Sequence, residues 1–105
     1  MATVDDRGRV ADRQMTAALY WTATTRLSIR QHDGLLVVTA DPHGVFTLTK
    51  QGHVRLPADA RRAGHLSSGD RVLLVAHLDR QTVTVFPPVA LDELVLPVLP
   101  GGEGL

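Results

Sequence analysis

The residues of this sequence with the clearest chemical potential are basic side chains gathered near its middle. Lys50, Arg55, Arg61 and Arg62 lie between positions 50 and 62, and Asp59 is the only carboxylate among them. Cations grouped in this way can neutralise the phosphates of a nucleic acid, which gives positioning and a salt-sensitive affinity. The alternative interpretation of such a cluster is a solvated protein face.

The other reactive residue types favour little further chemistry. The five histidines show no His-x-x-x-His spacing and no carboxylate-flanked cluster, so zinc binding and histidine catalysis are not expected. The absence of cysteine excludes disulfides and cysteine-based zinc sites. No aromatic residue interleaves with the basic ones, which argues against base stacking on single strands. We therefore expect no enzymatic activity, no metal and no cofactor.

The charge is distributed unevenly along the chain. Eleven basic and eleven acidic residues give a formal net charge of zero, which by itself argues against a strongly cationic nucleic-acid coat. Residues 1–42 sum to zero, residues 43–88 to +3, and residues 89–105 to −3. The neutral total therefore combines a basic middle with an acidic tail, and it limits the long-range field and the non-specific affinity for DNA.

Length and composition indicate one small domain. The chain has 105 residues, of which 44% are hydrophobic. Its longest apolar runs, such as residues 72–76, are far shorter than the roughly 20 residues of a membrane span. The N-terminal residues lack the basic and apolar pattern of a secretory signal. We expect a soluble, cytoplasmic protein with no membrane partner.

A weak internal repeat divides the chain into two similar units. Residues 5–10 align with 49–54 at an offset of 44, residues 22–27 with 67–72 at 45, and residues 35–38 with 82–85 at 47. The match is one of ordered pattern rather than identity, and any β-rich chain with regular turns partly matches itself. Because about 45 residues bury too little core to fold alone, two such units must complete each other, within one chain or between two.

The predicted elements are mainly short strands. The second unit is expected to contain an extended stretch at 45–48, a strand at 53–56, a helix at 58–63 and a hairpin of strands 72–76 and 82–86. Pro57 suits the first helical position, and Gly64 suits the helix end. In the first unit, strands 27–30 and 35–38 flank an Asp33-Gly34 turn. Trp21 aligns with Leu66, and we expect it to anchor the core.

The second unit resembles the AbrB/MazE/SpoVT family of bacterial DNA-binding domains. The resemblance covers about residues 45–87 and rests on Gly52, the step from Val54 to Pro57, the basic pair Arg61-Arg62 and the Gly69-Asp70 turn. It implies a swapped-hairpin β-barrel made of two related β-α-β-β units. It also implies a transcriptional regulator that binds duplex DNA as a dimer or as an intrachain pseudo-dimer.

The first unit is similar to a degenerate copy. It keeps Gly8 and Val10, but Arg13 stands where the family has proline and Ala17-Ala18 stand where it has the basic pair. Thr24-Thr25 replace Gly-Asp in the following turn. We therefore divide the chain into a degenerate unit at 1–42, a DNA-binding unit at 43–88 and an acidic tail at 89–105.

The resemblance also implies a set of DNA-binding residues. Arg61 and Arg62 occupy the family's DNA-contacting pair, and Arg55 matches the basic residue of its Val-Arg-Ile-Pro step. His53 replaces an arginine frequent in relatives, so it offers a hydrogen bond rather than a full charge. Arg9 keeps that arginine in the first unit, although neighbouring aspartates offset its charge. The predicted set is Lys50, His53, Arg55, Arg61 and Arg62, assisted by Arg7 and Arg9.

The acidic tail leaves two further functions open. Residues 89–98 are predicted to begin a short helix that Pro97 ends, and the simplest interpretation is a capping turn followed by a loose end. A MazE-like antitoxin would instead use such a tail to bind a toxin protein and would repress its own operon. The third hypothesis is a barrel that serves only oligomerisation.

Overall fold

The computed structural model describes residues 2–90 and shows a mainly β protein with a few short helices, as the sequence predicts. The strands are β1 (Ala2–Thr3), β2 (Arg9–Val10), β3 (Arg26–His32), β4 (Leu35–Ala40), β5 (Phe46–Thr47), β6 (Val54–Arg55), β7 (Arg71–His77) and β8 (Thr82–Phe86). The helices are α1 (Arg13–Ala18), α2 (Ala58–Ala63) and the 3₁₀ turn η1 (Leu78–Arg80). The predicted tail at 89–105 falls largely outside the described residues. Of its predicted helix at 89–98, only residues 89 and 90 are described, and both are helical.

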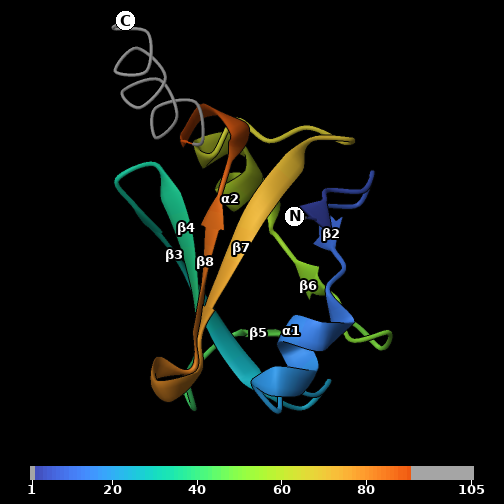
Figure 1. The fold of residues 1–105 in the computed structure, drawn as a ribbon, viewed down its shortest axis with the longest axis vertical. Helices are drawn as coiled ribbons and strands as arrows, with labels where there is room; N and C mark the ends of the chain where they lie inside the picture. The colour runs from blue at the N-terminus through green and yellow to red at the C-terminus, as the bar shows by residue number, and fades with distance from the viewer. Residues whose placement is uncertain (1, 91–105) are drawn as a thin grey trace, which may run out of the picture.

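Six strands form one antiparallel sheet in the order β1-β7-β8-β4-β3-β5. The sheet curls into a half-barrel, and α1 and α2 lie toward its opposite ends (Figure 1). The other two strands, β2 and β6, pair with each other as a separate antiparallel ribbon. Apolar side chains of this ribbon face those of β4, β7 and β8, so the core lies between ribbon and sheet.

The buried core draws on both halves of the chain. A single cluster contains Val4, Val10 and Leu36 from the first half and Leu56 and Val85 from the second, each at most 2% exposed. Because the two halves share this cluster, the two units complete each other within one chain, which is one of the two arrangements that the sequence left open.

The strand pairing follows the offsets of the internal repeat. Residue pair Ile29↔Val38 of the first hairpin corresponds to Leu74↔Val85 of the second, at offsets of 45 and 47. Between the hairpins, strand β4 pairs with β8. Replacing each residue of the pair Leu36↔Val85 by its equivalent at an offset of 47 gives the pair Val83↔Val38, which is also present. In the ribbon, Val10 pairs with Val54, its own equivalent at an offset of 44. The register therefore has approximate two-fold symmetry about the ribbon and the β4–β8 contact.

The N-terminal strand of each half joins the hairpin of the other half. Strand β1 pairs with β7, in the register Ala2↔Val72. Strand β5 pairs with β3, in the equivalent register Phe46↔Leu27. The two pairings place the halves of the chain in one continuous sheet rather than in two separate ones.

Helix α2 spans the predicted residues, but its ends differ in detail from the prediction. Pro57 is the N-cap, with extended backbone (φ −66°, ψ 160°), rather than the first helical residue. Gly64 keeps a negative φ, and the left-handed residue is His65 at φ 53°. Tyr20 takes the same conformation after α1. Both helices therefore end with a non-glycine residue in the left-handed conformation, so Gly64 is not required to end α2.

Trp21 is buried at 5% exposure, which confirms its predicted place in the core. Its indole Nε1 donates a hydrogen bond of 2.9 Å to the side-chain oxygen of Gln81. This bond satisfies the polar edge of a buried ring and joins the first half to the turn between β7 and β8.

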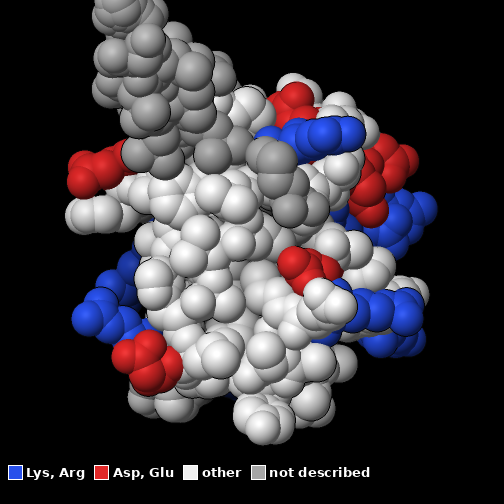
Figure 2. Space-filling model, viewed as in Figure 1, with Lys and Arg blue, Asp and Glu red and all other residues white. Residues whose placement is uncertain are grey.

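The face of the sheet that points away from the core carries several apolar side chains. Half-buried apolar side chains alternate there with the core-facing ones, namely Leu35, Val37, Leu73, Val75 and Phe86. In the view of Figure 2, most Lys, Arg, Asp and Glu side chains lie along the two sides of the molecule. Within residues 2–90, no helix is both long and apolar enough to cross a membrane.

Candidate nucleic-acid interface

The predicted site residues are organised by the β2–β6 ribbon. A glycine turn precedes each strand, at residues 5–8 before β2 and at residues 49–52 before β6. Because the ribbon is antiparallel, with Arg9 opposite Arg55 and Val10 opposite Val54, the two turns lie at its opposite ends. The ribbon therefore separates the predicted residues into two groups.

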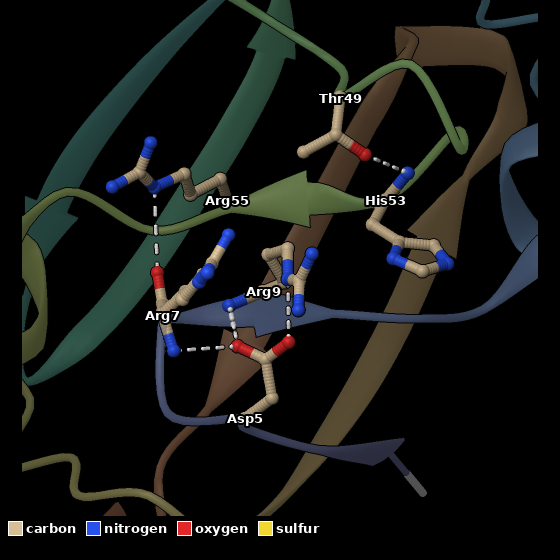
Figure 3. Close-up of polar contacts among 6 residues, drawn as sticks. All are labelled: Asp5, Arg7, Arg9, Thr49, His53 and Arg55. Carbon is tan, nitrogen blue, oxygen red and sulfur yellow. Dashed lines mark hydrogen bonds and ion pairs between the residues drawn. The ribbon is translucent and has the colours of Figure 1, made fainter.

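In the first turn, Asp5 caps the backbone and holds Arg9 (Figure 3). One oxygen of its carboxylate accepts hydrogen bonds from the backbone N–H groups of Arg7 at 2.9 Å and Arg9 at 2.8 Å. The other accepts from Nε of Arg9. Desolvation raises the pKa of Asp5, but the hydrogen bonds from the Arg9 backbone, the Arg9 side chain and the Arg7 backbone lower it, so that its pKa lies below the ordinary value. Asp5 is therefore ionised at neutral pH and neutralises Arg9.

The second turn has the same backbone hydrogen bonds, but an uncharged side chain takes the place of the carboxylate. Thr49 N–H donates to the carbonyl of His53 at 2.9 Å, as Asp5 N–H donates to that of Arg9 at 3.0 Å. The hydroxyl of Thr49 accepts from the backbone N–H of His53 at 3.1 Å (Figure 3). Thr49 is thus the uncharged equivalent of Asp5, and the cap itself requires no carboxylate.

Arg55 lies at the end of β6 that adjoins the first turn. It stands directly opposite Arg9 in the ribbon, and its Nε donates to the carbonyl of Arg7 at 3.3 Å (Figure 3). Like charges directly opposite each other destabilise a strand pair. Three arginines therefore meet at one end of the ribbon, with Asp5 paired to one of them.

Arg61 of α2 packs against the same turn. A Cβ at Gly8 would lie 2.7 Å from Nε of Arg61 and 2.8 Å from the carbonyl oxygen of Leu56, so only glycine leaves room for this arginine. The Nε atom is buried and has no hydrogen-bond partner within the described part of the chain. Its position adds a fourth arginine to the group, which we call the arginine cluster: Arg7, Arg9, Arg55 and Arg61.

The remaining predicted residues lie outside this cluster. Arg62 is exposed on α2 and forms an ion pair with Asp59, so the two members of the basic pair have different surroundings. Lys50 is exposed in the second turn, and His53 is half-buried beside it, at the other end of the ribbon. The structure therefore brings four of the seven predicted residues together and separates Lys50 and His53 from them.

The two-fold symmetry relates none of the clustered arginines to another lysine or arginine. At an offset of 44, Arg7, Arg9 and Arg55 correspond to Gln51, His53 and Ala11. The helices α1 and α2 align at an offset of 45, so Arg61 corresponds to Thr16 and not to Ala17, as the offset of 44 predicts. The sequence predicts only an assisting role for Arg7 and Arg9, because the neighbouring Asp5 and Asp6 offset their charges. The register shows that the first half contributes two of the four clustered arginines, and a repeat alignment alone does not contain this information.

Metal-ligating residue types do not gather elsewhere in the described part of the chain. No group of three or more His, Asp or Glu residues that could hold a metal ion occurs among residues 2–90. The histidines that the structure describes form no cluster with carboxylates beyond the exposed contact between His32 and its neighbour Asp33. No protein-family model, curated protein or solved structure matches the chain.

Proposed function

We propose that this protein is a duplex-DNA-binding transcriptional regulator of the AbrB type that acts through its arginine cluster. The observation that carries the proposal is the convergence of Arg7, Arg9, Arg55 and Arg61 around one glycine turn. Four arginines against the two aspartates of that turn leave a formal charge of +2 at this end of the ribbon. Guanidinium groups match phosphate oxygens in geometry, and a concentration of them attracts a polyanion.

The electrostatics of the ribbon favour an anionic ligand. Arg9 and Arg55 lie directly opposite each other, where like charges repel, and Asp5 is paired with Arg9 alone. A phosphate diester at this place would offset the repulsion and accept hydrogen bonds from the guanidinium groups. Contacts of this kind position a protein on DNA and make its affinity depend on salt.

The strand pairing supports the family assignment within this proposal. We infer that the half-barrel is the swapped-hairpin barrel of the AbrB type, with both units in one chain. Support comes from the exchange of the N-terminal strands, since β1 joins the second hairpin and β5 joins the first in equivalent registers. In such a barrel the β2–β6 ribbon presents both glycine turns at the surface for a ligand.

A salt titration tests the proposed function. The dissociation constant for duplex DNA, beginning with the promoter of the protein's own gene, is measured by gel shift at several salt concentrations. If the three clustered arginines that Asp5 does not hold each neutralise about one phosphate, the slope of log affinity against log salt is roughly −2.7. The variant R55A/R61A should lose affinity at every salt concentration and reduce the slope by about 2, because it removes two cations of the cluster.

A matched variant separates this effect from a general loss of charge. Arg30 and Arg80 are also exposed, but Arg30 lies on β3 and Arg80 in η1, away from the ribbon. R30A/R80A should keep affinity and slope nearly unchanged. Equal losses in both double variants, or binding that does not depend on salt, would contradict the arginine cluster as the DNA site.

A further inference from the structure

A groove of about 300 Å³ lies between α2 and the sheet. Its walls are mainly apolar and include Ile29 of β3, Leu36 of β4 and Phe46 of β5, with Ala60 and Ala63 on the helix side. At Ala63 it adjoins a second groove of about 330 Å³, which Pro87, Val89 and Ala90 also line. The two grooves together run along α2 from β5 to the last described residue.

The equivalent space in the other half of the molecule is filled. Helix α1 buries Met15 at 8% exposure and Leu19 at 1%, and Trp21 follows at 5%. At an offset of 45, these residues correspond to Ala60, Gly64 and Leu66, each of which is smaller. Pro87 occupies part of the space beside Gly64, where a Cβ would lie 3.2 Å from its ring, but the groove beneath Ala60 stays open in the described structure.

The chain itself provides a segment that suits this groove. At Ala90, where the described structure ends, the chain lines the second groove together with Ala63. The next nine residues, 91–99, contain six Leu or Val side chains: Leu91, Leu94, Val95, Leu96, Val98 and Leu99. An extended segment of this length reaches about 30 Å, more than enough to follow a helix of six residues.

We propose that residues 91–99 of the same chain pack into the α2 groove and supply the apolar side chains that Met15, Leu19 and Trp21 provide in the other half. The segment would remove the exposed apolar walls of the groove from water, and this burial is the driving force for docking. Val89, which is 51% exposed at the groove edge, would be covered in the same way. This proposal does not depend on DNA binding.

Disulfide trapping tests the proposal cleanly because the native sequence contains no cysteine. In the full-length chain, L94C is combined with A60C, which faces the groove, or with A58C, which is exposed on the same helix and does not line the groove. A parallel pair of variants uses L96C. Intramolecular disulfide formation under mild oxidation is followed by gel mobility and peptide mass at low protein concentration.

If the segment docks, L94C or L96C should cross-link to A60C about tenfold faster than to A58C. The reason is that a docked segment has a high effective concentration at the groove. A segment that stays in solvent would react faster with the more accessible A58C, and this result would overturn the proposal. Cross-links that form only between two chains would overturn it as well, because they identify a second copy as the occupant.

A second substitution tests whether the groove itself holds the segment. A60M places at α2 the residue that α1 carries at the equivalent position. In a chain carrying A63C and L94C, it should fill the groove and slow the cross-link several-fold, with circular dichroism as the check on folding. Methyl NOEs between Ile29 or Ala60 and the tail in the unmodified protein provide an independent measurement. The absence of such NOEs together with an unchanged cross-linking rate in A60M would contradict docking.

Discussion

At the scale of single residues, the two glycine turns differ in the side chain that caps them, which is the carboxylate of Asp5 in one and the hydroxyl of Thr49 in the other. Asp5 and Thr49 accept equivalent backbone hydrogen bonds, from Arg9 and His53 respectively. Only Asp5 also holds a guanidinium group, and the hydrogen bonds from Arg9 and Arg7 lower the pKa of Asp5 below its ordinary value. In the proposed function, Asp5 therefore competes with DNA phosphate for Arg9 and reduces the charge of the arginine cluster.

The variant D5T tests this competition, because it copies Thr49 and can keep the backbone cap. It should raise the affinity for duplex DNA several-fold and steepen the salt slope by about 0.9, since Arg9 becomes free to neutralise one more phosphate. Gel shifts over a salt series measure both quantities. D6T is the control: Asp6 lies in the same turn and is exposed, but the carboxylate paired with Arg9 is that of Asp5. If both variants have the same effect, the gain reflects net charge alone and not the release of Arg9.

At the scale of elements, the contact between α2 and the first turn depends on a single glycine. Gly8 and Gly52 have nearly the same left-handed backbone, with φ of 78° and 83°. A Cβ at Gly8 would collide with Arg61 and with the backbone of Leu56, whereas at Gly52 it would meet nothing within 4 Å. The two positions therefore separate the cost of the backbone conformation from the cost of the contact.

Alanine substitutions at the two glycines should differ in stability for this reason. G52A is expected to lower the free energy of unfolding by about 1 kcal/mol, the cost of a left-handed alanine. G8A should lower it by about 3 kcal/mol, because the collision with Arg61 and Leu56 adds a packing cost. Urea denaturation measures both. Equal losses would show that both Arg61 and the backbone at Leu56 move away freely, so that neither is held tightly against the turn.

At the scale of the whole molecule, the fold is nearly symmetric and the charges are not. The register repeats between the halves, but none of the four residues equivalent to the clustered arginines is a lysine or an arginine. A protein of this kind that binds DNA would contact it strongly at one end of the ribbon and weakly at the other. Within the proposed function, this favours an operator without two-fold symmetry.

Restoring the missing charges tests this polarity. Q51R/H53R copies Arg7 and Arg9 into the second turn and should extend a one-sided hydroxyl-radical footprint to both sides of the site. The salt slope should steepen by about 1.8, for two added phosphate contacts. The control Q31R/H32R makes the same two substitutions on exposed residues of β3, away from the ribbon. A footprint that is already symmetric in the wild-type protein would contradict the polarity.

Several features of this protein are determined by the sequence alone because they are local. The hairpin turns, the helix at 58–63 and the strand at 82–86 follow from residue types and spacing over a few positions. The offsets of the repeat are also visible in the sequence, and the strand registers agree with them. Trp21 could be assigned to the core because a single large apolar residue aligned with Leu66.

Other features depend on contacts between distant parts of the chain, and only the tertiary structure decided them. The meeting of Arg7 and Arg9 with Arg55 requires the antiparallel register of β2 and β6, two strands of two residues each that are 44 residues apart. The burial of Arg61 against Gly8 requires the same pairing. Sequence pattern reports which residues share a face of one element, whereas the side chains that meet across two elements are set by long-range packing, which leaves no short-range signal.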